Sequence, residues 1–227
     1  MSPVVAYAIA YAGVVAVTMG AALVPAPSRR RLAATVVAAG AVVALAALLR
    51  PLGVGGSIVV GLALLAGGST LGAALGARVA HAGYLLPVAV VSALADAVSV
   101  LHPAGPSAAV ATDASVAALL ALPAPVPDLG WVPILGVGDV VFTALYVSAA
   151  RRHGLGVART LGALALGFAA TMIAVVQTER ALPALPFLGV ALVLVVPEAR
   201  AIPAVERRTA WSVMIGCGVA ALALLAR

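Results

Sequence analysis

Long apolar runs separated by short polar turns extend along almost the whole chain. A helix of about 20 apolar residues crosses the hydrocarbon core of a bilayer. Eight runs approach or reach this length, and we expect one helix in each of 3–24, 32–50, 55–77, 82–101, 130–150, 156–176, 182–197 and 210–226. The pattern therefore predicts an all-α polytopic membrane protein, a bundle of about eight transmembrane helices.

The composition supports the same class. Of the 227 residues, 64% are hydrophobic and only 9% are charged, whereas a soluble domain averages about 25% charged residues. The mean hydropathy of +1.22 excludes a water-soluble surface, so the lipid bilayer is the first expected partner. A sequence rich in Ala, Val, Gly and Arg but without Lys is typical of a GC-rich bacterial genome, and we expect the bacterial cytoplasmic membrane.

The arginines predict the orientation. Arginines in short turns between apolar runs favour a topology signal over nucleic-acid binding. The loops after the first, third, fifth and seventh runs share one side, and they hold Arg29, Arg30, Arg31, Arg78, Arg151, Arg152, Arg159, Arg200, Arg207 and Arg208. The other side holds Arg50, Arg180 and Arg227. By the positive-inside rule, the N-terminus and the long loop 102–129 lie outside.

Two carboxylates interrupt the apolar runs. Five of the seven acidic residues fall in loops or at helix ends, while Asp96 and Asp139 lie inside runs 82–101 and 130–150. An ionised side chain there costs several kcal/mol, so both are functional candidates. At 1.5 Å per residue along each helix, both residues lie roughly 9–14 Å below one membrane face. We therefore expect the two carboxyl groups to meet.

Such a pair supports acid–base chemistry. Two close carboxylates share a proton instead of both ionising. One can then activate a water molecule while the other protonates a scissile carbonyl. Gly136 and Gly138 remove side chains beside Asp139, which gives a substrate backbone room to approach. The two acids alone fit a proton- or cation-coupled transporter equally well.

A third unusual feature opens the run 182–197. The sequence Pro183-Ala184-Leu185-Pro186 interrupts regular helical hydrogen bonding and predicts an irregular, strand-like segment at membrane depth. In the topology given above, this segment lies at the same membrane face as both aspartates.

These three features, in this order, resemble the presenilin and signal peptide peptidase family of GxGD intramembrane aspartyl proteases. The family has a catalytic Asp, then a GxGD motif, then a PAL motif two helices later, and this chain has Asp96, Gly136-Val137-Gly138-Asp139 and Pro183-Ala184-Leu185. "ALADAVSVLHPAGP" (93–106) and "ALPALP" (181–186) are also similar to presenilin segments.

The resemblance implies a function for each motif. Asp96 and Asp139 would be catalytic, and Gly136, Gly138, Pro183, Ala184 and Leu185 would bind substrate. The substrates would be transmembrane segments of membrane proteins or signal peptides, and neither a metal nor a cofactor is implied.

The expected organisation is a single membrane domain, 1–227. It would comprise an N-terminal three-helix part (1–81), a catalytic core (82–200) and an extra C-terminal helix (201–227).

The family has five helices before the first catalytic one, where we expect three, and Ala95 stands where the family has Tyr. A transporter or channel, or an inactive member that binds transmembrane helices, stays open as an alternative, as does a homo-oligomer.

Overall fold

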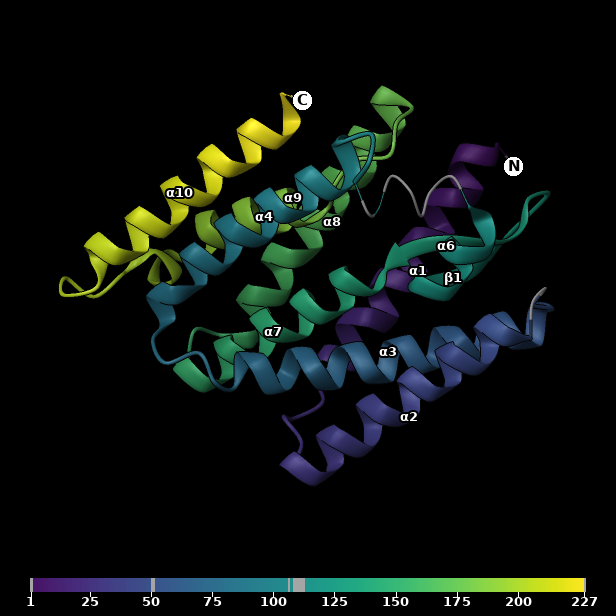
Figure 1. The fold of residues 1–227 in the computed structure, drawn as a ribbon, viewed down its shortest axis with the longest axis horizontal. Coiled ribbons are helices and arrows are strands. Elements are labelled where there is room, and N and C mark those ends of the chain that lie inside the picture. Colours follow the sequence, from purple (N-terminus) through teal and green to yellow (C-terminus); the bar gives the residue numbers. More distant parts are fainter. Residues whose placement is uncertain (1, 50–51, 106, 108–112, 227) are drawn as a thin grey trace. The chain divides into compact units, whose positions relative to one another are not determined.

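The computed structural model describes residues 2–49, 52–105, 107 and 113–226. Six of the helices in this part of the chain are long and apolar enough to cross a membrane, so the membrane-sized elements are all helical, as predicted. These six correspond to six of the eight predicted spans (Figure 1).

The contacts divide the chain into two compact units. The first unit comprises Met1–Arg78 and Asp113–Ser148, and the second comprises Val79–Thr112 and Ala149–Arg227. Each unit therefore combines an earlier and a later segment of the chain, and each is described by itself.

The first unit contains three long helices, a short helix, a hairpin and most of a further helix. Its elements are α1 (Pro3–Ala22), α2 (Arg29–Leu48), α3 (Val54–Gly76), α6 (Ala114–Leu120), β1 (Ala121–Val126), β2 (Gly130–Gly136) and α7 (Val137–His153), whose last five residues belong to the second unit. The serine residues Ser2 and Ser28 cap α1 and α2.

Small residues bring α3 and α7 into close contact. A Cβ placed on Gly68 would lie 3.1 Å from Cγ1 of Val140, and one on Gly72 would collide with the carbonyl oxygen of Val141. About two turns beyond Val141, the buried Ser148 hydroxyl donates a hydrogen bond of 2.7 Å to the carbonyl of Ala73. The glycine spacing in α3 thus has the packing role that small residues have in membrane helices.

The second unit is built around α9. Its elements are η1 (Ala82–Tyr84), α4 (Leu85–Leu101), α8 (Val157–Thr178), α9 (Leu185–Val195), η2 (Pro197–Arg200) and α10 (Arg207–Leu225). Helix α9 packs against both α4 and α8, and α10 packs against α4. A Cβ on Gly167 of α8 would lie 2.8 Å from Cα of Leu188, and one on Gly189 would lie 3.2 Å from Cβ of Ala89.

The helix predicted over 130–150 is wrong in its first part. Residues Gly130–Gly136 form strand β2, which pairs antiparallel with β1, and the helix begins only at Val137. Pro133 faces Pro123 in the hairpin, and prolines are excluded from helix interiors but accepted in edge strands. The turn places Pro127 before Asp128, whose φ is 67°, as in a type II turn.

The span predicted over 182–197 is also shorter than expected. Helix α9 has 11 residues, which corresponds to about 16 Å at 1.5 Å per residue, well short of the 30 Å core. Residues 181–184 are not helical, so the irregular segment before Leu185 is confirmed, although it forms no strand among the residues described.

Candidate functional site

The first carboxylate binds the third motif directly. Asp96, in the last two turns of α4, accepts a hydrogen bond of 3.0 Å from the backbone N–H of Leu185. Leu185 is the first residue of α9, and the first N–H groups of a helix have no acceptor within the helix. The Asp96 carboxylate therefore caps α9 and fixes the segment 183–185 beside itself.

Close packing between α4 and α9 holds this arrangement in place. Ala89, two turns before Asp96, contacts Gly189 of α9, and Ser92 donates a hydrogen bond of 3.2 Å to the Ala89 carbonyl. Beyond Asp96, the Ser99 hydroxyl lies 2.7 Å from that of Ser107 and accepts the backbone N–H of Ser107 at 3.0 Å. The polar side chains Ser92, Asp96 and Ser99 of α4 thus all make hydrogen bonds.

The second carboxylate lies in the first turn of α7. Asp139 is the third residue of this helix and is half-buried. The depth inferred from nine preceding helical residues is therefore wrong, because β2 occupies most of those positions. The GxGD motif instead forms the junction between a strand and a helix.

The two glycines of the motif leave space at this junction. Both are exposed. A Cβ on Gly136 would lie 3.5 Å from Oδ2 of Asp139, and a Cβ on Gly138 would meet nothing within 4 Å. Neither position therefore places a side chain against the carboxylate of Asp139.

Several polar side chains lie buried in the same unit as Asp139. Tyr11 of α1, which is 8% exposed, interacts electrostatically with Asp139. The fully buried hydroxyls of Thr18 and Thr143, and that of Ser69, have no hydrogen-bond partner in the part of the chain that the structure describes.

These hydroxyls differ from those of other helical threonines. Thr160, Thr171 and Thr178 each donate to the carbonyl four residues earlier, which is the usual way for a helix to satisfy a hydroxyl. An unpartnered buried hydroxyl costs about 1–3 kcal/mol, so the hydroxyl of Thr143, one turn after Asp139, is a polar group that the surrounding protein leaves unsatisfied.

The structure thus brings the predicted site residues together in two groups. Gly136, Gly138 and Asp139 lie in the first unit, while Asp96 and the segment 183–185 lie in the second. The meeting of the two carboxyl groups stays a prediction.

Sequence reasoning missed the interaction of Tyr11 with Asp139 and the donor role of the Leu185 backbone. A tyrosine inside an apolar run was a signal for the first, since a buried phenol usually needs a polar partner. No sequence signal identifies a backbone donor.

An ion pair joins the first turn of α8 to η2 in the second unit. Arg159 Nη2 donates to Glu198 Oε1 at 2.7 Å, and the same guanidinium donates to the carbonyl of Leu155. This hydrogen bond holds the pKa of the Glu198 carboxyl below its usual value. In the same unit, His153 Nε2 lies 2.9 Å from the carbonyl oxygen of Val79. This contact joins the end of α7 to the segment before η1.

Comparison with known proteins does not identify a family. No protein-family model, no curated protein and no solved structure matches the chain.

Proposed function

We propose that the chain is an intramembrane aspartyl protease that hydrolyses peptide bonds within transmembrane segments. One observation carries the proposal: the carboxylate of Asp96 accepts the N–H of Leu185 at 3.0 Å, so the first and third motifs of the resemblance are physically joined. An Asp at a helix terminus can serve as a structural cap alone, so the proposal also needs Asp139, beside which Gly136 and Gly138 leave room for a substrate backbone.

The proposed reaction uses both carboxyl groups, one ionised and one protonated. The ionised group takes a proton from water, whose oxygen attacks the scissile carbonyl carbon, while the protonated group gives its proton to the carbonyl oxygen. The resulting gem-diol collapses as the C–N bond breaks and the amine nitrogen takes a proton. The carboxyl pair ends with the number of protons with which it began.

Substrate would bind as an extended strand. Leu185 has committed its N–H to Asp96 and the carbonyl of Ala184 accepts the N–H of Leu188, so a strand would pair with main-chain groups of the non-helical residues 181–183. The substrate helix must unwind before its carbonyl is accessible, so helix-breaking residues near the cleavage point should raise the rate. The proposed substrates are membrane-protein helices or signal peptides.

Cleavage of a reconstituted transmembrane substrate tests this function. We expect the wild type to cleave and Asp139→Asn to lose at least about 100-fold in rate, the lower range for acid–base groups. Asp128→Asn is the matched control, because Asp128 is exposed in the hairpin turn at φ 67°, a conformation that Asn also accepts. Equal rates for the wild type and Asp139→Asn would refute the proposal.

A second function is favoured by the unpartnered hydroxyls. Thr18, Ser69 and Thr143 are buried in the unit of Asp139, and hydroxyls that hold water are typical of proton paths beside a membrane carboxylate. A proton- or cation-coupled transporter would move charge across vesicles without cleaving peptides. Vesicle pH measurements with wild type and Asp139→Asn separate the two functions.

The proposed location is the bacterial cytoplasmic membrane, with the N-terminus outside. Ten arginines on one side of the expected topology favour this orientation, by the positive-inside rule. Labelling of a single cysteine introduced at Ser28, in a Cys217→Ser background, tests it: an impermeant reagent should not reach residue 28 in sealed cells.

A further inference from the structure

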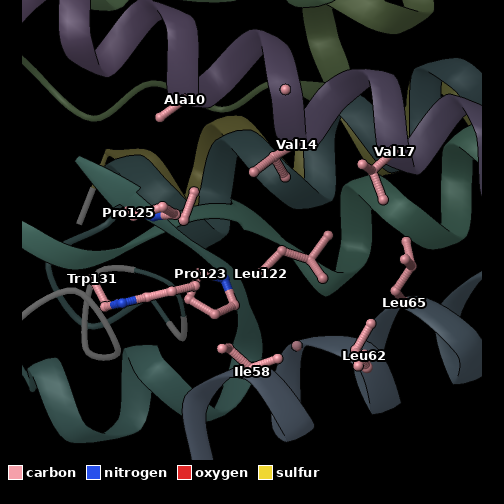
Figure 2. A pocket seen from close by; sticks show the side chains of 13 residues that line it. Ala10, Val14, Val17, Ile58, Leu62, Leu65, Leu122, Pro123, Pro125 and Trp131 are labelled. Atoms are coloured by element: carbon pink, nitrogen blue, oxygen red, sulfur yellow. The ribbon is translucent and has the colours of Figure 1, made fainter. Parts of the chain in front are cut away.

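A pocket opens in the first unit between α1, α3 and the hairpin. It has a volume of about 450 Å³, within the range of small-molecule sites. Figure 2 shows Val17 and its neighbours on α1 facing Leu62 on α3, with Pro123, Pro125 and Trp131 of the hairpin at one end. Every lining side chain is apolar except for the indole N–H of Trp131.

The walls exclude an extended peptide as the occupant. Two of the six residues of β1 are Pro123 and Pro125, which have no N–H to donate. A peptide strand laid along β1 would therefore keep unpaired main-chain groups inside an apolar site, at several kcal/mol each. The same walls suit a hydrocarbon chain, because it has no polar groups to satisfy.

The size of the pocket also favours a narrow occupant over a packed helix. A helix with its side chains is about 10–12 Å wide, whereas the pocket, with a volume of about 450 Å³, is comparable to sites for small molecules. A single acyl chain is far narrower than a helix, and it does not have to continue as a rigid rod beyond the pocket.

We propose that this pocket binds one acyl chain of a phospholipid. The indole of Trp131 would lie at the level of the lipid headgroup, where tryptophans gather in membrane proteins, and its N–H would donate to an ester or phosphate oxygen. The acyl chain exchanges one hydrocarbon environment, the bilayer, for another, the pocket. Its binding therefore depends on packing and on the indole N–H, and not on the hydrophobic effect. We therefore expect a preference of several-fold over bulk lipid.

Gly13 provides a way to fill the pocket without disturbing its walls. It lines the pocket, and a Cβ placed on it would meet nothing within 4 Å. Gly20 lies on the same helix, is equally exposed and also has nothing within 4 Å, but it does not line the pocket. Gly13→Leu and Gly20→Leu thus form a matched pair in which only the first blocks the site.

Native mass spectrometry of the full chain tests the proposal. Each protein is reconstituted into vesicles of palmitoyl-oleoyl phosphatidylglycerol, extracted with detergent and measured for retained lipid. We expect one lipid on the wild type and on Gly20→Leu, and at least fivefold lower occupancy on Gly13→Leu. Equal occupancy of all three proteins, equal loss from both variants, or a retained peptide in place of lipid would overturn the proposal.

A fluorescence measurement covers the case in which Gly13→Leu fails to fold. Trp211→Phe leaves Trp131 as the only tryptophan, and vesicles containing chain-brominated phosphatidylcholine quench it on contact. Val17 lines the pocket and is itself exposed, so Val17→Phe narrows the pocket with a larger side chain. In this variant, quenching of Trp131 fluorescence should need several-fold more brominated lipid. Identical quenching curves with and without Val17→Phe would overturn the proposal.

Discussion

The close approach of α3 to α7 makes a strong prediction for Gly72→Ala. A Cβ on Gly72 would collide with the carbonyl oxygen of Val141 and lie 2.9 Å from Cβ of Ala144, about 0.5 Å inside the 3.4 Å at which ordinary contact begins. The carbonyl belongs to the helix backbone and cannot rotate away. The two helices must therefore separate, and α7 carries Asp139 in its first turn.

The magnitude follows from two opposing effects. Overpacking a well-packed contact costs about 1–3 kcal/mol, whereas replacing Gly by Ala in a helix returns about 0.8–1 kcal/mol. A collision with backbone that cannot rotate away belongs at the upper end of the overpacking range. We therefore expect the free energy of unfolding to fall by about 1–2 kcal/mol, measured by detergent-induced unfolding followed by circular dichroism. Gly40→Ala is the control: it lies in α2 with nothing within 4 Å of its Cβ position, so it should be neutral or slightly stabilising.

A second substitution tests the mechanism of this loss. Ala144→Gly removes one of the two obstacles to a side chain at Gly72 but leaves the carbonyl of Val141 in place. The double variant Gly72→Ala/Ala144→Gly should therefore regain only part of the lost stability. Gly72→Ala as stable as the wild type, or complete rescue by Ala144→Gly, would refute the reasoning.

Three further predictions concern individual contacts. Thr143→Val removes an unpartnered buried hydroxyl and should raise the free energy of unfolding by about 1 kcal/mol. Ser148→Ala removes a hydrogen bond of 2.7 Å and should lower the free energy of unfolding by about 0.5–1.5 kcal/mol. The reverse order of the two variants would contradict both assignments. Gly167→Ala forces a side chain against the backbone of α9 and should lower the melting temperature, while Gly162→Ala, on the same helix with open space, should not. Glu198→Gln should be slightly less stable than the wild type at neutral pH. Because the folded pKa of Glu198 is lowered, this difference in stability should vanish as the pH falls through that pKa. A difference in stability that persists in acid would exclude the ion pair as its source.

The sequence was sufficient where one local property decides the structure. The length of each apolar run predicted the six long helices, since the bilayer thickness sets the number of residues. The prolines at 183 and 186 predicted the non-helical entrance to α9, because proline removes a helical donor. The four-residue spacing of Gly68 and Gly72 is typical of a close helix contact, but it does not identify α7 as the partner.

The sequence was insufficient where distant segments decide the structure. Residues 130–136 read as the start of a long helix, because a short apolar run alone does not distinguish strand from buried helix. Their state depends on pairing with 121–126, and Pro133 was the only local warning. In the same way, the cost of burial identified Asp96 as a candidate, but the hydrogen bond from Leu185, 89 positions later, comes from tertiary structure.

The central claim is that Asp96 and Asp139 act as one hydrolytic pair, and a double-mutant cycle on the rate of substrate cleavage tests it most directly. Residues that act as a unit show strongly non-additive losses. We predict that Asp96→Asn, Asp139→Asn and the double variant lose cleavage to about the same extent, each at least about 100-fold. Losses that multiply in the double variant, or a single variant that cleaves at the wild-type rate, would contradict the claim.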